Sequence, residues 1–302
     1  MNSMVKAKKI GDTREDKILN YITIFILSTL LILYIYPIYF ILIASFSDPN
    51  AIWNGEVIFF PVNFSLEGYI EILNNMELWR GYLNSIQYTS IGVVVNLFFT
   101  LPAAYVLSCR EFMLRSVVMK IFTFTMFFSG GLIPSFLLVL SLRLNNTMWA
   151  LILPGAASVF NIIITRTFFM NSIPYDLKEA ALLDGCGHIR YFISVVLPLS
   201  TAIIAVIALY YGVGHWNGYF SAMIYLRDRS LFPLQLILRE IIIRSAAIFD
   251  GAGSEAEFAR LVRLAEVVKY CSILISSVPA LIAYPFVQRF FVKGVMIGSI
   301  KG

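Results

Sequence analysis

The chain has 302 residues, of which 59% are hydrophobic and only 14% are charged. Soluble domains are about 45–50% apolar and about 25% charged, so this composition excludes an ordinary soluble domain. The net charge of +5 does not indicate nucleic-acid binding, because Lys and Arg residues cluster beside hydrophobic runs, as orientation in a bilayer requires. We therefore expect an integral membrane protein.

Six hydrophobic runs are long enough to form membrane-spanning helices. A helix needs about 20 apolar residues to cross about 30 Å of hydrocarbon, with its backbone hydrogen bonds made inside the segment. The first run lacks a small-residue cleavage site and is too long for a signal-peptide core, so we expect it to stay in the mature protein. An all-α membrane fold follows, with spans at about 19–45, 83–107, 117–140, 149–170, 194–225 and 268–291.

The distribution of cations predicts how these spans are oriented. If the N-terminus is cytoplasmic, 14 of the 23 Lys and Arg residues fall in inside segments, an excess typical of the cytoplasmic side. We therefore expect both termini in the cytoplasm, an N-terminal segment at 1–18 and one membrane domain at 19–302. Long outer loops are predicted at about 46–82 and 226–266, the second with a helix-like stretch at Leu234–Ile243. A cytoplasmic loop is predicted at about 171–193. The inside cations are Lys6, Lys8, Lys9, Arg14, Lys17, Arg110, Arg115, Lys120, Arg166, Lys178, Arg190, Arg289, Lys293 and Lys301.

No catalytic or metal-binding pattern is recognisable along the chain. Cys109, Cys186 and Cys271 are far apart and have no metal-ligand spacing, so we expect neither disulfides nor a metal site. His188 and His215 are also isolated. A phosphate-binding GxxxxGK[ST] loop is missing, so we expect no ATP hydrolysis by this chain, no catalytic residues and no cofactor of its own.

The loop at 171–193 has the pattern of a short amphipathic helix. Ser172 can begin a helix whose first turn tolerates Pro174, and Gly185 suits the left-handed position at which a helix ends. Apolar residues three and four apart predict a buried face. We expect Ile173, Leu177, Ala180 and Ala181 on that face, and Asp176, Glu179 and Leu183 towards the other side.

Within this loop the triplet Glu179-Ala180-Ala181, then Gly185 and Leu197-Pro198, resembles the EAA loop of bacterial ATP-binding-cassette (ABC) importer permeases. Val195 replaces the family's usual Ile, which is a mild departure. The resemblance implies a coupling helix that docks into a cytoplasmic ATPase, with contacts from Glu179, Ala180, Ala181, Asp184 and Gly185. An amphipathic helix resting in lipid headgroups is the structural alternative, and Asp184 with Arg190 could form a local surface pair.

Further segments narrow the resemblance to carbohydrate-uptake permeases similar to the six-span membrane protein of the maltose importer. They are Tyr82-Leu83-Asn84-Ser85, Pro102-Ala103-Ala104-Tyr105, the run 214–240 and the C-terminal run 288–302. The run 214–240 resembles a branch linked to uptake of polysaccharide fragments, including uronate-containing ones. The C-terminal run implies ATPase contacts from Lys293, Gly294, Gly298 and Lys301.

The resemblance implies a type I importer in the bacterial cytoplasmic membrane. Its expected partners are a second, homologous permease, two cytoplasmic ATPase subunits that bind ATP and Mg, an extracellular or periplasmic solute-binding protein and the oligosaccharide itself. The membrane subunits would alternate between inward-facing and outward-facing states.

Substrate contacts are expected near the outer end of the fifth span. Rings of Trp216 and Tyr219 could stack on a sugar, and the amide of Asn217 could bond its hydroxyls. Interfacial anchoring explains the same aromatic residues equally well. Asn96, Asn161 and Gln87 either line a route or form hydrogen bonds between helices.

Two other functional classes stay open on the sequence, an ion-coupled secondary carrier and a membrane enzyme or scaffold without transport. A carrier is expected to show broken, repeated helices or a carboxylate relay, and no Asp or Glu lies well inside a predicted span. Copurification discriminates between the classes, because an importer subunit should bring an ATPase and a second permease with it.

Overall fold

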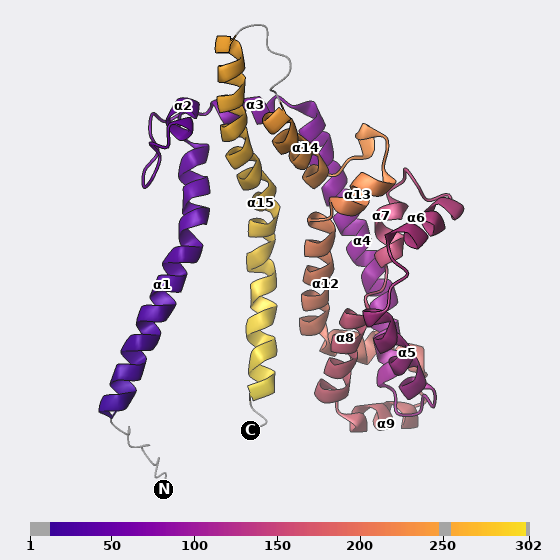
Figure 1. The fold of residues 1–302 in the computed structure, drawn as a ribbon. Coiled ribbons are helices and arrows are strands. Elements are labelled where there is room, and N and C mark those ends of the chain that lie inside the picture. The colour runs from indigo at the N-terminus through magenta and orange to yellow at the C-terminus, as the bar shows by residue number, and fades with distance from the viewer. Residues whose placement is uncertain (1–12, 248–254, 300–302) are drawn as a thin grey trace.

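The computed structural model describes residues 13–247 and 255–299, and every regular element in this part of the chain is a helix (Figure 1). The elements are α1 (Arg14–Ser45), α2 (Pro49–Trp53), α3 (Glu67–Leu73), α4 (Met76–Ser108), α5 (Arg115–Phe127), α6 (Leu132–Ser141), α7 (Trp149–Ile152), η1 (Leu153–Gly155), α8 (Val159–Ser172), α9 (Tyr175–Leu183), α10 (His188–Tyr191), η2 (Phe192–Val196), α11 (Leu197–Leu199), α12 (Thr201–Trp216), α13 (Phe220–Tyr225), η3 (Arg229–Leu231), α14 (Leu234–Ala247) and α15 (Glu255–Ser299).

Three helices are long and apolar enough to cross a membrane unbroken. They are α1, α4 and the stretch Val262–Ile282 of α15. They agree with the first, second and sixth predicted spans, because each contains an uninterrupted apolar run with no strong helix stop. Proline occurs inside all three helices, at Pro37, Pro102 and Pro279 among other positions, without ending them.

The other three predicted spans are bent pairs of helices, not continuous helices as the hydrophobic runs implied. The bend is 112° between α5 and α6, 52° between Trp149–Gly155 and α8, and 82° between His188–Leu199 and α12. The predicted fifth span at 194–225 is therefore wrong as one helix, since its first residues belong to the segment before the bend. If each bent pair counts as one span, the total rises to six.

Local backbone geometry explains where these runs break. Gly131, directly before α6, has φ 84° and ψ 179°, a region open almost only to glycine. The fourth run breaks between Gly155 and Ser158, which begins α8 with extended backbone. The fifth bends at Ser200, which follows the π-helical turn η2 and the short helix α11 with Pro198 inside it. Hydrophobicity alone gives no sign of such breaks.

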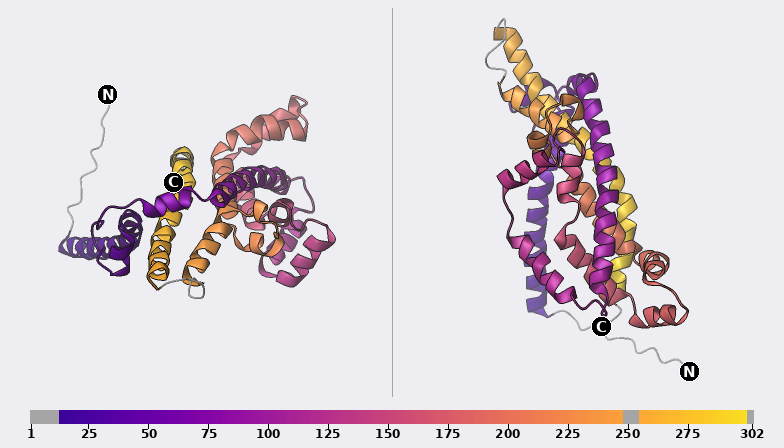
Figure 2. Two further views of the ribbon diagram at one scale, coloured as in Figure 1. Left: turned by 90° about the horizontal axis from the view of Figure 1, so that it is seen from above. Right: turned by 90° about the vertical axis from the view of Figure 1, so that its right-hand side faces the viewer.

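The main core surrounds α4, which packs along α8 and α12. Its fully buried apolar side chains include Ala104 on α4, Ile162 on α8 and Ile207 on α12. A second cluster joins α3, α4, α14 and α15 through Ile72 and Val267, among others. In contrast, α1 lies at the edge of the molecule, on the far side of α15 from α4 (Figures 1 and 2).

The two ends of the bundle carry different elements (Figure 1). One end, called the α9 end below, contains α9, the first turn of α1 and the last turns of α15. The opposite end, called the α14 end, contains α2, α3 and α14. The helix α14 confirms the predicted helix-like stretch in the second long loop.

Candidate functional site

The first turn of α9 is set by Pro174, not by the predicted Ser172 cap. Ser172 is the last residue of α8, Ile173 is extended, and Pro174 stands at the N-cap without any side-chain hydrogen bond. The residue before a proline is disfavoured in the helical region, so the chain must leave α8 at Ile173. The Ser172 prediction is therefore wrong by two residues, although a short helix follows as expected.

The end of α9 is a Schellman turn around Gly185. Gly185 has φ +74°, and its N–H donates to the carbonyl of Leu182 at 3.0 Å. The N–H of Cys186 donates to the carbonyl of Ala181 at 2.8 Å. These are the two bonds that define this helix stop, which requires a left-handed residue usually supplied by glycine. The predicted role of Gly185 as the helix stop is confirmed.

The face of α9 that turns inward differs from the predicted one. Lys178 is only 6% exposed, and Ala181 is partly buried, whereas Leu177 and Ala180 are exposed. Tyr175 is also partly buried. The helix is therefore rotated relative to the prediction, because the buried Lys178 with its partly exposed partner Glu111, rather than an apolar stripe, lies on the inward face.

Glu111, in the turn between α4 and α5, is the partner of Lys178. The Lys178 Nζ donates to Glu111 Oε2 at 2.5 Å, and the Tyr175 hydroxyl donates to Glu111 Oε1 at 2.7 Å. These hydrogen bonds, from Lys178 first, lower the pKa of Glu111 to about 2. Burial is the largest single effect on Lys178 and acts to lower its pKa, but the hydrogen bond to Glu111 and the further interactions with Glu111 and Cys109 together outweigh it, so that pKa is raised. The guanidinium of Arg110 lies 4.7 Å from the centre of the Tyr175 ring.

Sequence reasoning missed this polar cluster. The sequence marks Lys178 only as one inside cation among many, and it assigns no role to Glu111. The one available signal is the spacing of Tyr175, Lys178 and Ala181, which puts them on one face of a helix.

The outward face of α9 and the turn after it combines acids with exposed apolar side chains. Asp176, Glu179 and Asp184 are exposed, and so is Gly185. Leu183 is 89% exposed. Exposed apolar groups beside acids are typical of a helix that fits into a groove of another protein. Further large apolar side chains exposed on this segment are Leu177, Leu182 and Ile189.

The predicted C-terminal contact residues lie near this end or beyond the described part. Lys293, Gly294 and Gly298 belong to α15, whose last turns are at the α9 end (Figure 1). Lys301 lies outside the described residues. The predicted contacts of these four residues stay predictions.

The three predicted sugar-contact residues, at and just after the end of α12, differ in their surroundings. The indole of Trp216 donates to the carbonyl of Ser276 on α15 at 3.1 Å, and packs edge-on against Tyr82 at 5.7 Å. Asn217 is exposed at the end of α12, and the exposed Tyr219 ring lies beneath the guanidinium of Arg239. Trp216 thus has structural contacts of its own, and sugar binding by the three residues stays a prediction.

Two sequence segments singled out by the family resemblance contact each other at the α14 end. The amide of Asn84 donates to the carbonyls of Ser230 and Phe232 at 2.8 and 3.0 Å. The Ser85 hydroxyl accepts the N–H of Leu234, the first residue of α14. The motif at 82–85 therefore holds the loop that leads into α14.

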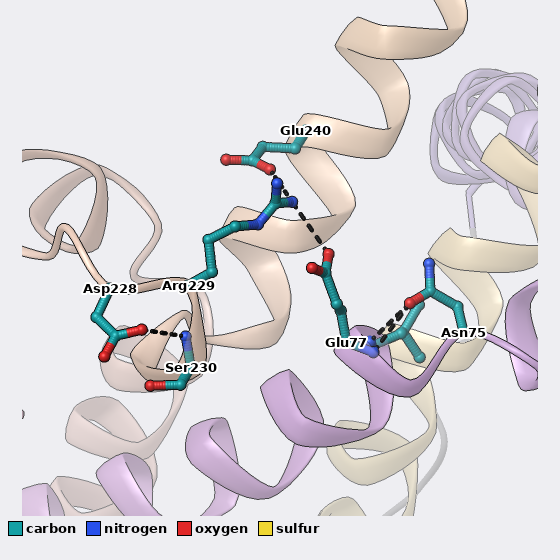
Figure 3. Close-up of polar contacts among 7 residues, drawn as sticks. Asn75, Glu77, Asp228, Arg229, Ser230 and Glu240 are labelled. Atoms are coloured by element: carbon teal, nitrogen blue, oxygen red, sulfur yellow. Dashed lines mark hydrogen bonds and ion pairs between the residues drawn. The ribbon is translucent and has the colours of Figure 1, made fainter.

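An exposed ion cluster continues this contact (Figure 3). Arg229 donates to Glu77 at 3.0 Å and to Glu240 at 2.9 Å, and so joins the start of α4 to α14. Asp228 accepts the N–H of Ser230, and Asn75 caps α4 by accepting the N–H of Glu77. Together these contacts fix the loop before α14 on the N-terminal end of α4.

Of the buried amides, Asn96 forms hydrogen bonds between helices. Its Nδ2 donates to the carbonyl of Gly155 at 2.7 Å, and its Oδ1 lies 2.6 Å from His215 Nε2. Asn161 is buried on α8, whereas Gln87 is exposed on α4 and has a 4.0 Å contact to the sulfur of Met148. Of the two predicted uses, lining a route or bonding between helices, Asn96 therefore shows the second.

Comparison with known proteins gives extensive similarity. No protein-family model matches the chain. It is 39% identical over 271 residues to the polygalacturonan/rhamnogalacturonan transport system permease protein YtcP of Bacillus subtilis, covering 88% of this chain and 92% of that protein. It is 36% identical over 299 residues to Protein LplC of the same organism, covering 99% and 100%.

A solved structure is similar over nearly the whole chain. It is a chain of a bacterial ABC transporter involved in the import of the acidic polysaccharide alginate, with a TM-score of 0.83 and 33% sequence identity. The match covers 92% of this chain and 98% of that one. The bent helices therefore belong to a fold that a solved ABC transporter also has.

Proposed function

This chain belongs to the family of permease subunits of carbohydrate ABC transport systems, and we propose that it forms half of the pathway of an ATP-driven oligosaccharide importer. The observation that carries the proposal is α9, a short helix with exposed acids and exposed leucines at one end of the bundle. A separate ATPase subunit docks there and supplies the energy. The chain itself is a transport subunit rather than an enzyme.

The docking residues are those on the outward face of the α9 segment. Glu179 offers a charge to a cationic partner, and Ala180 lets the partner approach closely. Asp184 and Gly185 follow at the helix stop, while Ala181 packs inward and fixes the helix position. Helix-in-groove contacts of this kind depend on a few anchor side chains spaced along one face, and Leu183 has the exposure that such an anchor needs.

A second, homologous permease completes the pathway. The helix α5 has no buried residue in the described structure, although it is largely apolar. Most of α1 is likewise exposed along its length. In a bilayer such faces contact lipid or another membrane subunit. Closure of two ATPase subunits would move α9 and switch the cavity between the two permeases from inward-facing to outward-facing.

The α9 end faces the cytoplasm and the α14 end faces outward. The excess of inside cations supports this orientation. The start of α1 and the end of α15 also lie at the same end of the molecule as α9 (Figure 1), as two cytoplasmic termini require. The membrane is the bacterial cytoplasmic membrane. A solute-binding protein delivers the sugar to the α14 end, where α2, α3 and α14 form the outer surface.

The substrate class is an oligosaccharide derived from an acidic polysaccharide. YtcP and the alginate transporter are both named for the uptake of polymers of this kind. Arginines near the α14 end, including Arg227 and Arg239, are available to attract uronate carboxylates. Bidentate contacts between arginine and carboxylate are strong and selective.

Copurification and ATP hydrolysis test the proposal. The chain is expressed with the second permease, the ATPase and the binding protein encoded with it, and the complex is purified and placed in proteoliposomes. We expect ATP hydrolysis to rise when binding protein loaded with an oligogalacturonate is added, and labelled sugar to accumulate. Glu179→Lys should abolish the rise, whereas Glu15→Lys, an exposed acid on α1 at the same end, should not.

Transport by the chain alone, driven by an ion gradient, would support a secondary carrier instead. A purified chain without partner subunits and without transport would support the scaffold alternative. Equal stimulation in Glu179→Lys and in wild type would contradict docking through α9.

A further inference from the structure

Helix packing does little to hold α9 against the rest of the molecule. Among the described elements none packs extensively along it. Behind it lies a cavity of about 300 Å³, at the junction of α9 with the cores of α4 and α8. Residues lining this cavity include Tyr105, Cys109, Phe169, Pro174, Lys178 and Tyr191. Apart from its chain connections and a few partly buried side chains, α9 is therefore held mainly by polar contacts.

These polar contacts converge on Glu111. The carboxylate accepts from Lys178 at 2.5 Å and from Tyr175 at 2.7 Å, so both of its oxygens are used. The side chain of Lys178 is 8% exposed and that of Glu111 is 46% exposed. A buried ammonium without a partner is costly, so separating Lys178 from Glu111 while the lysine stays buried is unfavourable.

Glu111 lies in the turn that directly follows α4. It lies three residues beyond Ser108, the last residue of that helix. The same end is also tied to α8, because Arg166 Nε donates to the carbonyl of Leu107 at 2.9 Å. A displacement of α9 therefore reaches α4 through Glu111.

The helix α4 extends from this point to the opposite end of the molecule. It has 33 residues, about 50 Å at 1.5 Å per residue. It packs on α8, α12 and α14, and at its far end Glu77 contacts Arg229 (Figure 3). One continuous helix thus connects the surroundings of α9 to the loop before α14.

We propose that Glu111 is a positioning residue that transmits the movement of α9 to α4, through its ion pair with Lys178 and its hydrogen bond from Tyr175. The inference rests on the proposed function, since it requires that an ATPase moves α9. Glu111 contacts neither sugar nor nucleotide. Its effect is on coupling: without it, α9 still docks by its outward face, but α4 no longer follows.

The experiment measures how much sugar enters per ATP hydrolysed, in proteoliposomes containing the whole transporter. Glu111→Gln removes the charge, and we expect the ratio to fall about five-fold or more while hydrolysis continues, as for loss of a typical coupling between sites. The double variant Glu111→Lys with Lys178→Glu restores opposite charges and should recover a substantial part of the ratio. Glu15→Gln serves as the control for removing an exposed acid at the same end.

The outcomes distinguish a loss of coupling between ATP hydrolysis and uptake from a loss of stability of the complex. An unchanged ratio of imported sugar to hydrolysed ATP in Glu111→Gln would overturn the inference. A charge-reversed double variant whose ratio is no higher than that of Glu111→Gln would overturn it too. If Glu111→Gln does not assemble, the double variant Glu111→Lys with Lys178→Glu decides, and an assembled double variant whose ratio stays at least five-fold below wild type would overturn the inference. A wild-type complex without ATP-driven uptake would instead contradict the proposed function.

Discussion

The side-chain amide of Asn96 on α4 donates a 2.7 Å hydrogen bond to the carbonyl of Gly155, where the fourth hydrophobic run is broken. On the other side of the break, the N–H of Ser158 donates to the hydroxyl of Tyr211 at 3.0 Å, and this hydroxyl lies 2.7 Å from Thr100 Oγ1. Lipid offers no hydrogen-bond partners to free backbone groups. The break is therefore stable because α4 and α12 satisfy it from both sides.

Asn96→Leu should destabilise the protein. The substitution removes the bond to Gly155 and the contact with His215. Hydrogen bonds between membrane helices contribute about 0.6 to 2 kcal/mol each, so we expect a loss of about 1 to 3 kcal/mol. Unfolding in mixed detergent and SDS micelles measures it. Gln87→Leu on the same helix is the control, and an equal effect of both substitutions would argue against a special role for Asn96.

Tyr211→Phe should have a smaller effect of the same kind. The ring keeps its packing in the core, but the hydroxyl that accepts from Ser158 is lost. We expect a loss of about 1 kcal/mol in the same unfolding assay. Tyr210→Phe is the matched control, because the neighbouring Tyr210 is 47% exposed. If Tyr211→Phe leaves the free energy of unfolding unchanged, the N–H of Ser158 must find another hydrogen-bond partner.

Substitutions at Gly185 should follow backbone preference rather than size. No atom lies within 4 Å of a Cβ added there, so only its φ of +74° restricts the choice. A left-handed conformation costs roughly 1 to 2 kcal/mol for most residues, whereas asparagine adopts it more readily. We expect Gly185→Val to weaken the copurification of the ATPase strongly and Gly185→Asn to weaken it little. If both variants lose the ATPase equally on copurification, Gly185 itself contacts the ATPase.

The ion pair of Glu111 should make stability depend on acid pH. The pKa of Glu111 is lowered from 4.5 to about 2, so the pair stabilises the fold fully above the unfolded value near 4.5. This contribution is lost as the pH falls from 4.5 towards 2. At pH 7 we expect wild type to have a higher melting temperature than Glu111→Gln. By pH 3 this difference in melting temperature should shrink. Because the carboxylate is partly exposed, the difference should be modest, and a constant difference over this range would contradict the assignment.

Those features of the fold that depend on the local sequence were predictable. The six hydrophobic runs follow from the length that a bilayer demands. The stop of α9 at Gly185 follows from a conformation that glycine adopts most easily. The helix over Leu234–Ala247 follows from its own apolar spacing.

The features that the sequence did not reveal depend on distant residues or on single backbone angles. Glu111 is 67 positions from Lys178, so nothing near the lysine indicates its burial. The break before α6 depends on Gly131, one of 18 glycines in the chain. The bond from Asn96 to Gly155 joins positions that are 59 apart. In each case the tertiary partner or a single backbone angle, rather than the local pattern, decides the conformation.

Photo-crosslinking from position 183 tests the central claim most directly. A photoreactive amino acid replaces Leu183, which is 89% exposed on α9, or, as a control, Phe60, which is 76% exposed near the α14 end. The cells carry the whole transport system, and the adducts are identified by mass spectrometry. We expect position 183 to crosslink to an ATP-binding subunit and position 60 not to do so. Crosslinks from position 183 to lipid alone would contradict the account.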